Sequence, residues 1–515
     1  MSESPIQTRQ GQPLLALMVH IVVVLGLVAT HLAVDERTLG IPETLDLLSG
    51  VLLALSGWLA ASWWMAERSL LNPYGLFLLG SMPFHVGYAF LRFIGQDSLI
   101  WLRGAVTEVQ MVEALAYVTA CYALLHLGAL AVSAANARPE PSPGASLFDG
   151  TRVYQVGWLL IAISLVPLLL RLRSSMETVV AGGYSSLFEG GGRDPVGTQG
   201  LLALIAEFYL PGVMFLLAGS RGRPLGQAAA VLGLLFYSGS YLFLGFRAFS
   251  LIPIAAFVWV WHRCVRRLPI LPVVTIGLGA FLIIAPLIRR VRDMSGVDRL
   301  SLDSLWQAYV GADNPILTLI AELAGSVLTI PFTAELVPDI RPFEMGYGYL
   351  KALANAIPMW HLPDAYGYAG SWLAWHVTPE LAVGGFGLGF SFMAEAYMNF
   401  GWVGGAVMVG LIGAGVAGLQ KWTVSVPDPA RVAFVASFLP ILIFFTRGES
   451  LSITRPIFWY ALIPFAMVHL FRTLDRRIAG EPRPQRRQGR MYPDDRMPEA
   501  LRRTGPGWGT GEPRV

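Results

Sequence analysis

The sequence predicts an all-α polytopic membrane protein with about 12 transmembrane helices and a large periplasmic helical cap before the tenth helix. Of its 515 residues, 54% are hydrophobic and only 14% are charged, which is more apolar surface than a soluble domain of this length buries. Apolar stretches long enough to cross ~30 Å of hydrocarbon recur along the chain. Positively charged residues also gather in alternate connections, as expected of a protein that crosses a membrane repeatedly.

The predicted spans are twelve apolar stretches, at residues 13–34, 46–66, 74–95, 110–134, 152–171, 200–219, 226–245, 248–264, 269–288, 396–419, 431–446 and 453–472. The first stretch is too long for the apolar region of a signal peptide, so we expect it to be retained as a helix. One span more or fewer would invert every later connection, so the charges of the connections test this count.

With twelve spans, the basic residues of the connections all fall on one side of the membrane. They are Arg68, Arg138, Arg152, Arg221, Arg223, Arg263, Arg266, Arg267, Lys421, Arg431 and the arginine-rich C-terminus. The other side receives the turn Asp35–Glu36, the glycine-rich stretch 174–200 and the long segment 289–390. Because positive residues stay in the cytoplasm, we expect a multi-pass protein of the bacterial inner membrane with both termini cytoplasmic.

These assignments divide the chain into five regions. They are a cytoplasmic N-terminus (1–12), helices one to nine (13–288), a periplasmic loop or cap (289–390), helices ten to twelve (391–472) and a disordered basic cytoplasmic tail (473–515). The cap contains helix-like apolar spacing at Leu302–Leu323 and Tyr347–Ala356, interrupted by prolines. The tail is rich in arginine, proline and glycine, which is typical of disorder.

Charged residues at the external ends of spans are costly to keep there, so they are the first candidates for function. The predicted anion-binding residues are Arg247, Arg289, Arg290, Arg292 and Arg447, with Glu449 close to the last of them. Arginines bind phosphate groups through strong paired hydrogen bonds. The alternatives are a snorkelling anchor at Arg247, a solvated helix end at 289–292 and a salt-bridged turn at 447–455.

Glu395 lies at the start of the tenth span, where a carboxylate is a candidate for catalysis. Asn399 shares its helical face and Tyr397 points elsewhere, and we expect both to contact the substrate. All three residues belong to the sequence Ala-Glu-Ala-Tyr-Met-Asn-Phe-Gly. The alternative is that Glu395 caps a helix or pairs with an arginine. In the cap, His361 and His376 have side chains that accept a proton near neutral pH, although a cap histidine is more often a surface residue.

Several other patterns exclude function classes. Cys121 and Cys264 are too few for a disulfide framework or a thiolate metal site, and we predict neither a metal nor a cofactor. The glycines at 385, 387 and 389 lack the strand and helix of a nucleotide-binding loop. The glycines between 401 and 418 have the small-residue spacing of closely packed membrane helices.

The segment Gly389–Gly404, together with Tyr347-Gly-Tyr in the cap and Gly-Phe-Arg247, resembles the O-antigen polymerases of the Wzy type. These are relatives of the oligosaccharide repeat-unit polymerases and of O-antigen ligase. The resemblance implies a glycosyltransferase that moves a growing glycan from its undecaprenyl pyrophosphate carrier to a new lipid-linked repeat unit. It also implies that Arg247, the 289–292 cluster and Arg447 bind the phosphates, and that His361 lies near the acceptor.

The partners implied are lipid-linked donor and acceptor glycans and membrane lipids, with a chain-length regulator and a flippase as further candidates and no nucleic acid. Either Glu395 or His361 would then act as the base. An O-antigen ligase shares the donor chemistry and differs in its acceptor, so it stays open as an alternative. A transporter of lipid-linked anions is less consistent with the sequence, because it would need charged or broken helices near the middle of the membrane.

Overall fold

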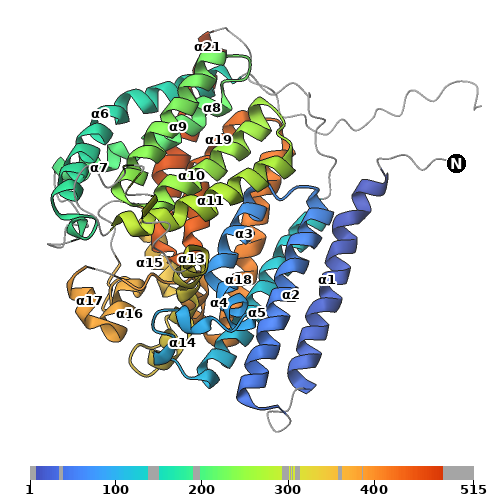
Figure 1. Cartoon of the computed structure of the whole chain (residues 1–515). Coiled ribbons are helices and arrows are strands. Elements are labelled where there is room, and N and C mark those ends of the chain that lie inside the picture. Colours follow the sequence, from blue (N-terminus) through green and yellow to red (C-terminus); the bar gives the residue numbers. More distant parts are fainter. Residues whose placement is uncertain are drawn as a thin grey trace, which may run out of the picture. The chain divides into compact units, whose positions relative to one another are not determined.

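The computed structural model describes residues 7–33, 39–136, 150–188, 198–292, 301, 303, 306–307, 314–357, 362–385 and 387–478. Every regular element in these ranges is a helix, which confirms the all-α prediction (Figure 1). Eleven helices are long and apolar enough to cross a membrane, or twelve if the bent pair formed by Pro73–His85 and Gly87–Phe93 is one span. The chain is therefore a polytopic membrane protein.

The helices before the cap follow the predicted order, but the apolar helix Pro272–Ile288, at the ninth predicted span, is shorter than the eleven candidate spans and is not among them. The helices before the cap are α1 (Gln7–Ala33), α2 (Ile41–Glu67), α3 (Pro73–His85), α4 (Gly87–Phe93), α5 (Glu108–Ala135), α6 (Thr151–Gly182), α7 (Thr198–Ala206), α8 (Tyr209–Ala218), α9 (Pro224–Leu244), α10 (Arg247–Val260) and α11 (Ile270–Arg292). A short π-helical turn, η4 (Trp261–Val265), extends α10. Polar caps set several of these boundaries: the Asn72 side chain accepts from the Gly75 amide at α3, and Thr107 and Gln110 form a capping box at α5.

The remaining helices comprise the cap and the last spans. They are α13 (Pro315–Ala324), η6 (Gly325–Leu328), α14 (Thr329–Leu336), α15 (Tyr347–Ala354), α16 (Ala369–Val377), α17 (Pro379–Val383), α18 (Phe392–Ser425), α19 (Pro429–Phe444), η7 (Phe445–Arg447), α20 (Leu451–Pro456), η8 (Ile457–Leu462) and α21 (Ile463–Ile478). The chain from Leu470 onward forms a separate unit, whose described part is the end of α21.

Two boundaries differ from the sequence-based expectation. The segment Pro315–Leu336, expected in the cap, is itself long and apolar enough to span a membrane. It is broken by the η6 turn, and α13 packs against α3, α4 and α11 whereas α14 packs against α5 and α18. The segment is therefore long enough to span a membrane, and it also packs against other helices. The last helix continues to Ile478, past the predicted limit at residue 472.

The helices form two groups that meet at α3 and α19. In one group α1, α2 and α18 surround α5, and in the other α6, α8, α9, α10 and α19 pack together (Figure 1). The contact between α5 and α18 is close because glycines line it: a Cβ on Gly413 would collide with the Leu125 carbonyl, and one on Gly128 with the Gly410 carbonyl. Small residues let membrane helices approach in this way, which confirms the predicted packing role of Gly410 and Gly413. A Cβ on Gly415 or Gly418 would meet no atom of the described residues within 4 Å, so the prediction does not hold for them.

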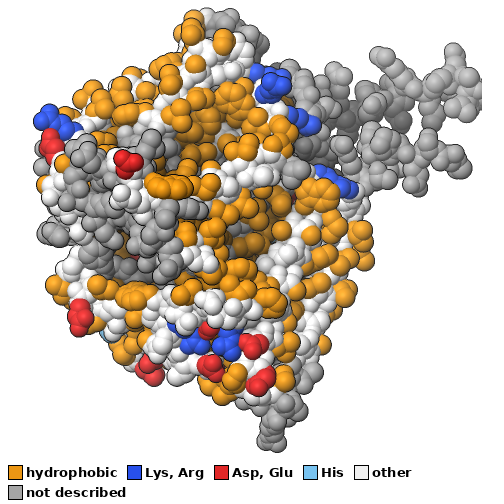
Figure 2. Space-filling view, viewed as in Figure 1, with side chains coloured by type: hydrophobic (Ala, Val, Ile, Leu, Met, Phe, Trp, Pro, Cys, Tyr) orange, Lys and Arg blue, Asp and Glu red, His pale blue; other side chains and the backbone are white. Residues whose placement is uncertain are grey.

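The two ends of this helical unit differ in charge. Lys421 pairs with Glu67, which connects the C-terminal parts of α18 and α2, and Arg223 donates to the Thr151 hydroxyl, which connects the starts of α9 and α6. In Figure 2 basic side chains gather at the upper edge, whereas acidic and basic side chains mix at the lower edge and apolar ones cover the surface between them. Helices α14 to α17 lie at the lower, mixed end (Figure 1).

Candidate functional site

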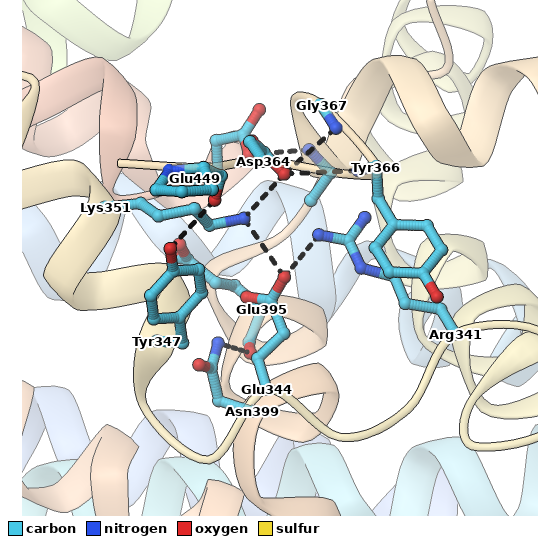
Figure 3. A network of polar contacts seen from close by, with 12 residues as sticks. Arg341, Glu344, Tyr347, Lys351, Asp364, Tyr366, Gly367, Glu395, Asn399 and Glu449 are labelled. Carbon is cyan, nitrogen blue, oxygen red and sulfur yellow. Dashed lines mark hydrogen bonds and ion pairs between the residues drawn. The ribbon is translucent and has the colours of Figure 1, made fainter. Parts of the chain in front are cut away.

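A polar cavity of about 200 Å³ lies where the cap meets the start of α18 and the turn before α20. The residues that line it are Arg341, Glu344, Gly348, Lys351, Asn355, Leu362, Asp364, Gly367, Tyr368, Ala369, Glu395, Met398, Glu449 and Leu451. Two cationic and four carboxylate side chains are among them. Figure 3 shows these charged groups pointing toward one another from the cap and from α18. Buried charges are expensive unless they are paired or bind a ligand, so the cavity is the strongest candidate site in the described chain.

A break in α18 explains how the cap reaches this position. Gly401 has φ 68° and ψ −167°, a conformation that interrupts the helix and leaves the carbonyls before it without helical partners. The carbonyls of Met398 and Asn399 accept instead from the backbone amides of Glu344 and Met345, at 3.1 and 2.9 Å. The Ala-Glu-Ala-Tyr-Met-Asn-Phe-Gly sequence therefore forms one short helical segment onto which the cap loop is docked.

Asn399 adds side-chain bonds to the same joint. Its Oδ1 accepts from the Gly346 amide at 3.1 Å, and its Nδ2 donates to the Glu395 carbonyl at 2.9 Å. Tyr397 points to another neighbour and donates to the Val337 carbonyl at 3.2 Å. Both side chains are buried and neither lines the cavity. Their contacts hold the cap against α18, and their predicted contact with substrate stays a prediction.

Glu395 lies in the wall of the cavity and is only 5% exposed. Its carboxylate accepts from the Ser450 hydroxyl at 2.5 Å and from the Ser450 amide at 2.8 and 3.0 Å. These bonds fix the carboxylate and join α18 to the turn that precedes α20. Among the described residues, no arginine forms a hydrogen bond or an ion pair with Glu395. The N-terminal cap of α18 is Ser391, so Glu395 does not cap this helix.

Arg341 is the largest buried charged side chain of the cavity, with an exposed fraction of 1%. Its guanidinium lies 5.0 Å from the ring centres of both Tyr366 and Trp372, and its Nη2 donates to Glu344 at 2.5 Å. Aromatic faces stabilise a cation in this arrangement. Nε and Nη1 of Arg341 are buried and have no hydrogen-bond partner among the described residues. The guanidinium is therefore fixed beside the cavity with two unpaired donors in the described part of the chain.

Lys351 is held between two carboxylates of the cap. Its Nζ lies 3.2 Å from Oε1 of Glu344 and 3.1 Å from Oδ1 of Asp364 (Figure 3). Asp364 also accepts from the amides of Tyr366 and Gly367, and the Tyr347 hydroxyl donates to the Pro363 carbonyl at 2.8 Å. These contacts close the loop 363–367 over α15 and place the Tyr366 ring beside Arg341.

Glu449 completes the cavity from the turn between α19 and α20. Its Oε2 accepts from the Ala369 amide at 2.9 Å. Burial raises the pKa of Glu449 above its ordinary value, while the amides of Ala369 and Gly370 and the charges of Arg341 and Lys351 oppose that rise. The carboxyl therefore retains a proton at a higher pH than an exposed glutamate does.

Two of the predicted external arginines lie at neighbouring helix ends. Arg247 begins α10 and pairs with Glu322 of α13, and its buried Nη1 has no hydrogen-bond partner in the part of the chain that the structure describes. Arg447 ends η7, with its guanidinium 5.9 Å from the Phe84 ring and its side chain against Gly389. Phe249 and Phe444, each close in sequence to one of these arginines, have ring centres 6.5 Å apart. Neither arginine lines the cavity, although Glu449 is two residues from Arg447.

The other predicted residues are placed less completely. Helix α11 carries the backbone of Arg289, Arg290 and Arg292, whose side chains lie outside the described residues. His361 also lies outside them, next in sequence to the lining residue Leu362. Nδ1 of His376 donates to the Trp372 carbonyl of its own helix at 2.8 Å, and His376 does not line the cavity. In residues 7–478, as far as they are described, no group of three or more His, Cys, Asp and Glu side chains is arranged to hold a metal.

Sequence reasoning missed four charged residues of the cavity, which are Arg341, Glu344, Lys351 and Asp364. Their sequence signal is weak, because they are spread over a loop that has neither helical nor strand periodicity. One signal was present: Lys351 is one of only two lysines in the chain. Charged residues that are rare in an apolar chain are more informative than the histidines of the same loop.

Residues 18–475 match the family described as O-antigen polysaccharide polymerase Wzy. The match covers most of the chain, contains every residue that lines the cavity, and confirms the resemblance noted in the sequence. A search of curated proteins and a search of solved structures each gave no match.

Proposed function

Because this chain belongs to the O-antigen polysaccharide polymerase family, we propose that it joins undecaprenyl-pyrophosphate-linked oligosaccharide repeat units into a surface polysaccharide. The reaction takes place on the periplasmic face of the bacterial inner membrane, and the product is O-antigen or a related glycan. The observation that carries this proposal is the polar cavity at the cap, which Glu395 and Arg341 both line. Both termini lie in the cytoplasm, because the basic connections lie at the end of the helices away from the cap.

The reaction requires the protein mainly to position the two substrates and to stabilise the negative charge that develops on the leaving group. The leaving group is a lipid pyrophosphate, which departs readily once its developing negative charge is neutralised. Arg247, Arg447 and the arginines that end α11 bind that pyrophosphate. Supporting this, α10 and η7 bring Arg247 and Arg447 to adjoining helix ends, and Glu449 of the cavity follows Arg447 after one residue. The anomeric carbon of the donor sugar then lies at the edge of the cavity.

The acceptor hydroxyl must lose a proton as it attacks the anomeric carbon of the donor. Glu395 is the base in this proposal, because its carboxylate is fixed by Ser450 and lines the cavity. The C–O bond to the new sugar forms as the bond to pyrophosphate breaks, the proton passes to Glu395, and the electron pair leaves with the pyrophosphate. A single displacement of this kind inverts the anomeric configuration. It uses no nucleotide sugar and no metal ion, so we expect polymerisation to continue in EDTA.

Gene deletion in the host tests the function. We expect deletion to replace the ladder of surface glycan on a gel by core carrying one repeat unit, and the wild-type gene to restore the ladder. Bare core, with polymer accumulating on the lipid carrier, would identify a ligase instead. An unchanged ladder would contradict both activities for this glycan.

A further inference from the structure

The cavity is small for a glycan-binding site. Its volume of about 200 Å³ is below the ~300–1,000 Å³ of pockets that enclose drug-sized ligands, so it has room for about one sugar ring. The charges of its wall are unbalanced: Arg341 and Lys351 face Glu344, Asp364, Glu395 and Glu449. A site of this size accommodates a single sugar unit, and the charges of its wall discriminate between sugars of different charge.

The two cations of the cavity already have anionic partners. Arg341 donates to Glu344 at 2.5 Å, and Lys351 lies within 3.2 Å of Glu344 and 3.1 Å of Asp364. An entering carboxylate or phosphate would compete with these partners for the two cations and would also face Glu395 and Glu449. Like charges disfavour each other strongly in a buried site. Negative charge on the ligand is therefore opposed by the wall.

Hydroxyl groups fit the same wall. Nε and Nη1 of Arg341 are buried donors without partners in the described chain, whereas the carboxyl-bearing residues Glu395 and Glu449 line the cavity. A hydroxyl accepts one hydrogen bond and donates another, so it satisfies a guanidinium and a carboxylate together. The rings of Tyr366 and Trp372 hold the guanidinium from its faces, which fixes the direction of its donors.

We propose that this cavity binds the acceptor sugar of the repeat unit, that Arg341 determines its specificity by donating to two of its oxygens, and that this sugar carries no negative charge. The inference rests on the proposed polymerase function and adds the class of acceptor to it. Glu395 takes the proton of the attacking hydroxyl, while Arg341 sets the position of the ring.

The polymer itself provides the first test. Nuclear magnetic resonance of the surface polymer, compared with the single repeat unit left by gene deletion, identifies the sugar that receives the new linkage. We expect a sugar without carboxylate or phosphate at that position. An acidic or phosphorylated acceptor sugar would overturn this inference while leaving the polymerase function intact, whereas unchanged polymer after deletion would refute the function itself.

A membrane assay with two lipid-linked units supplies the second test. One unit has the natural acceptor sugar, and the other has a primary hydroxyl of that sugar oxidised to a carboxylate. We expect the oxidised unit to be extended at least about tenfold more slowly by the wild-type protein. Equal rates for the two units would overturn the inference.

Arg341→Lys tests the specificity role, because lysine keeps the charge but lacks the fork of donors. We expect KM for the acceptor unit to rise about tenfold or more while kcat changes much less. Arg431→Gln is the matched control, since Arg431 also lies 5.0 Å from an indole ring, that of Trp422, and does not line the cavity. An unchanged KM in Arg341→Lys, at normal membrane levels, would exclude Arg341 from acceptor binding.

Discussion

The cavity and the cluster around Glu67 are both buried groups of charged residues that contact α18, but they differ in how fully their charges are matched. Glu67 accepts from the Ser133 hydroxyl and pairs with Lys421 at 2.6 Å, and its second oxygen accepts from Gln420 at 3.1 Å. In the cavity, two nitrogens of Arg341 lack a hydrogen-bond partner among the described residues, and four carboxyl side chains accompany two cations. The Glu67 cluster ties α2, α5 and α18 together, whereas the cavity keeps polar groups available to a ligand.

The largest effect should come from Glu395→Gln. The amide retains the shape of the carboxylate but cannot accept a proton, and loss of a general base costs ~10²–10⁴-fold in rate. We therefore expect no detectable ladder of surface glycan in a deletion strain that carries this variant at normal membrane levels. A wild-type ladder from Glu395→Gln would place the base elsewhere, with His361 as the next candidate.

Arg447→Ala should have the next largest effect. If Arg447 binds the pyrophosphate, its removal takes away charge stabilisation that develops as the leaving group departs, which costs ~10²–10³-fold in kcat for a comparable donor. The rate of polymer formation in membranes measures this loss. Arg447→Lys is the matched control and should recover part of the rate, whereas full activity of Arg447→Ala would remove it from the site.

Lys421→Met tests the other side of the comparison. It leaves the buried carboxylate of Glu67 without its cation, and breaking a buried ion pair costs ~3–5 kcal/mol of stability. We expect a lower melting temperature in detergent and less protein in the membrane, but a rate per molecule within about twofold of wild type. A specific loss of catalysis without a loss of stability would show that the Glu67 cluster has a functional role.

The smallest effect should be a change in pH dependence from Glu449→Gln. Because burial raises the pKa of Glu449, the folded protein binds this proton more tightly than the unfolded chain, whose glutamates have a pKa near ~4.3. The resulting stabilisation is complete below that pH and is lost as pH rises through the raised pKa. Over this pH range, the melting temperature of Glu449→Gln should therefore fall less steeply with rising pH than that of the wild type. If the melting temperatures of the two proteins depended on pH in the same way, the burial of an ionisable Glu449 would be contradicted.

The fold and two of the six charged residues of the cavity were predictable from the sequence for different reasons. Hydrophobic length and arginine placement are local signals, so they predict helices well. Glu395 and Glu449 were found because a carboxylate at a span end is unusual in an apolar chain. Arg341 and Lys351 were not found, because their surroundings depend on the bonds between Asn399 and the loop at 344–346, and such contacts leave no periodic pattern.

Arg247 shows a second limit of sequence reasoning. Its position at the start of α10 was predictable, but its pairing with Glu322 depends on the broken segment of α13 and α14, which the sequence analysis assigned to the cap. This segment has the apolar composition of a membrane span, but it is interrupted and makes contacts like those of the cap. Composition alone therefore did not identify Glu322 as the partner of Arg247.

Polymerisation by the purified protein tests the central claim most directly. Wild type and Glu395→Gln would be reconstituted in lipid vesicles with undecaprenyl-pyrophosphate-linked repeat units as the sole substrate, and the length of the glycan would be followed with time. Our account predicts that wild type forms polymer with release of undecaprenyl pyrophosphate, and that the variant forms none. Polymer formed by Glu395→Gln at the wild-type rate would contradict the assignment of the cavity as the active site.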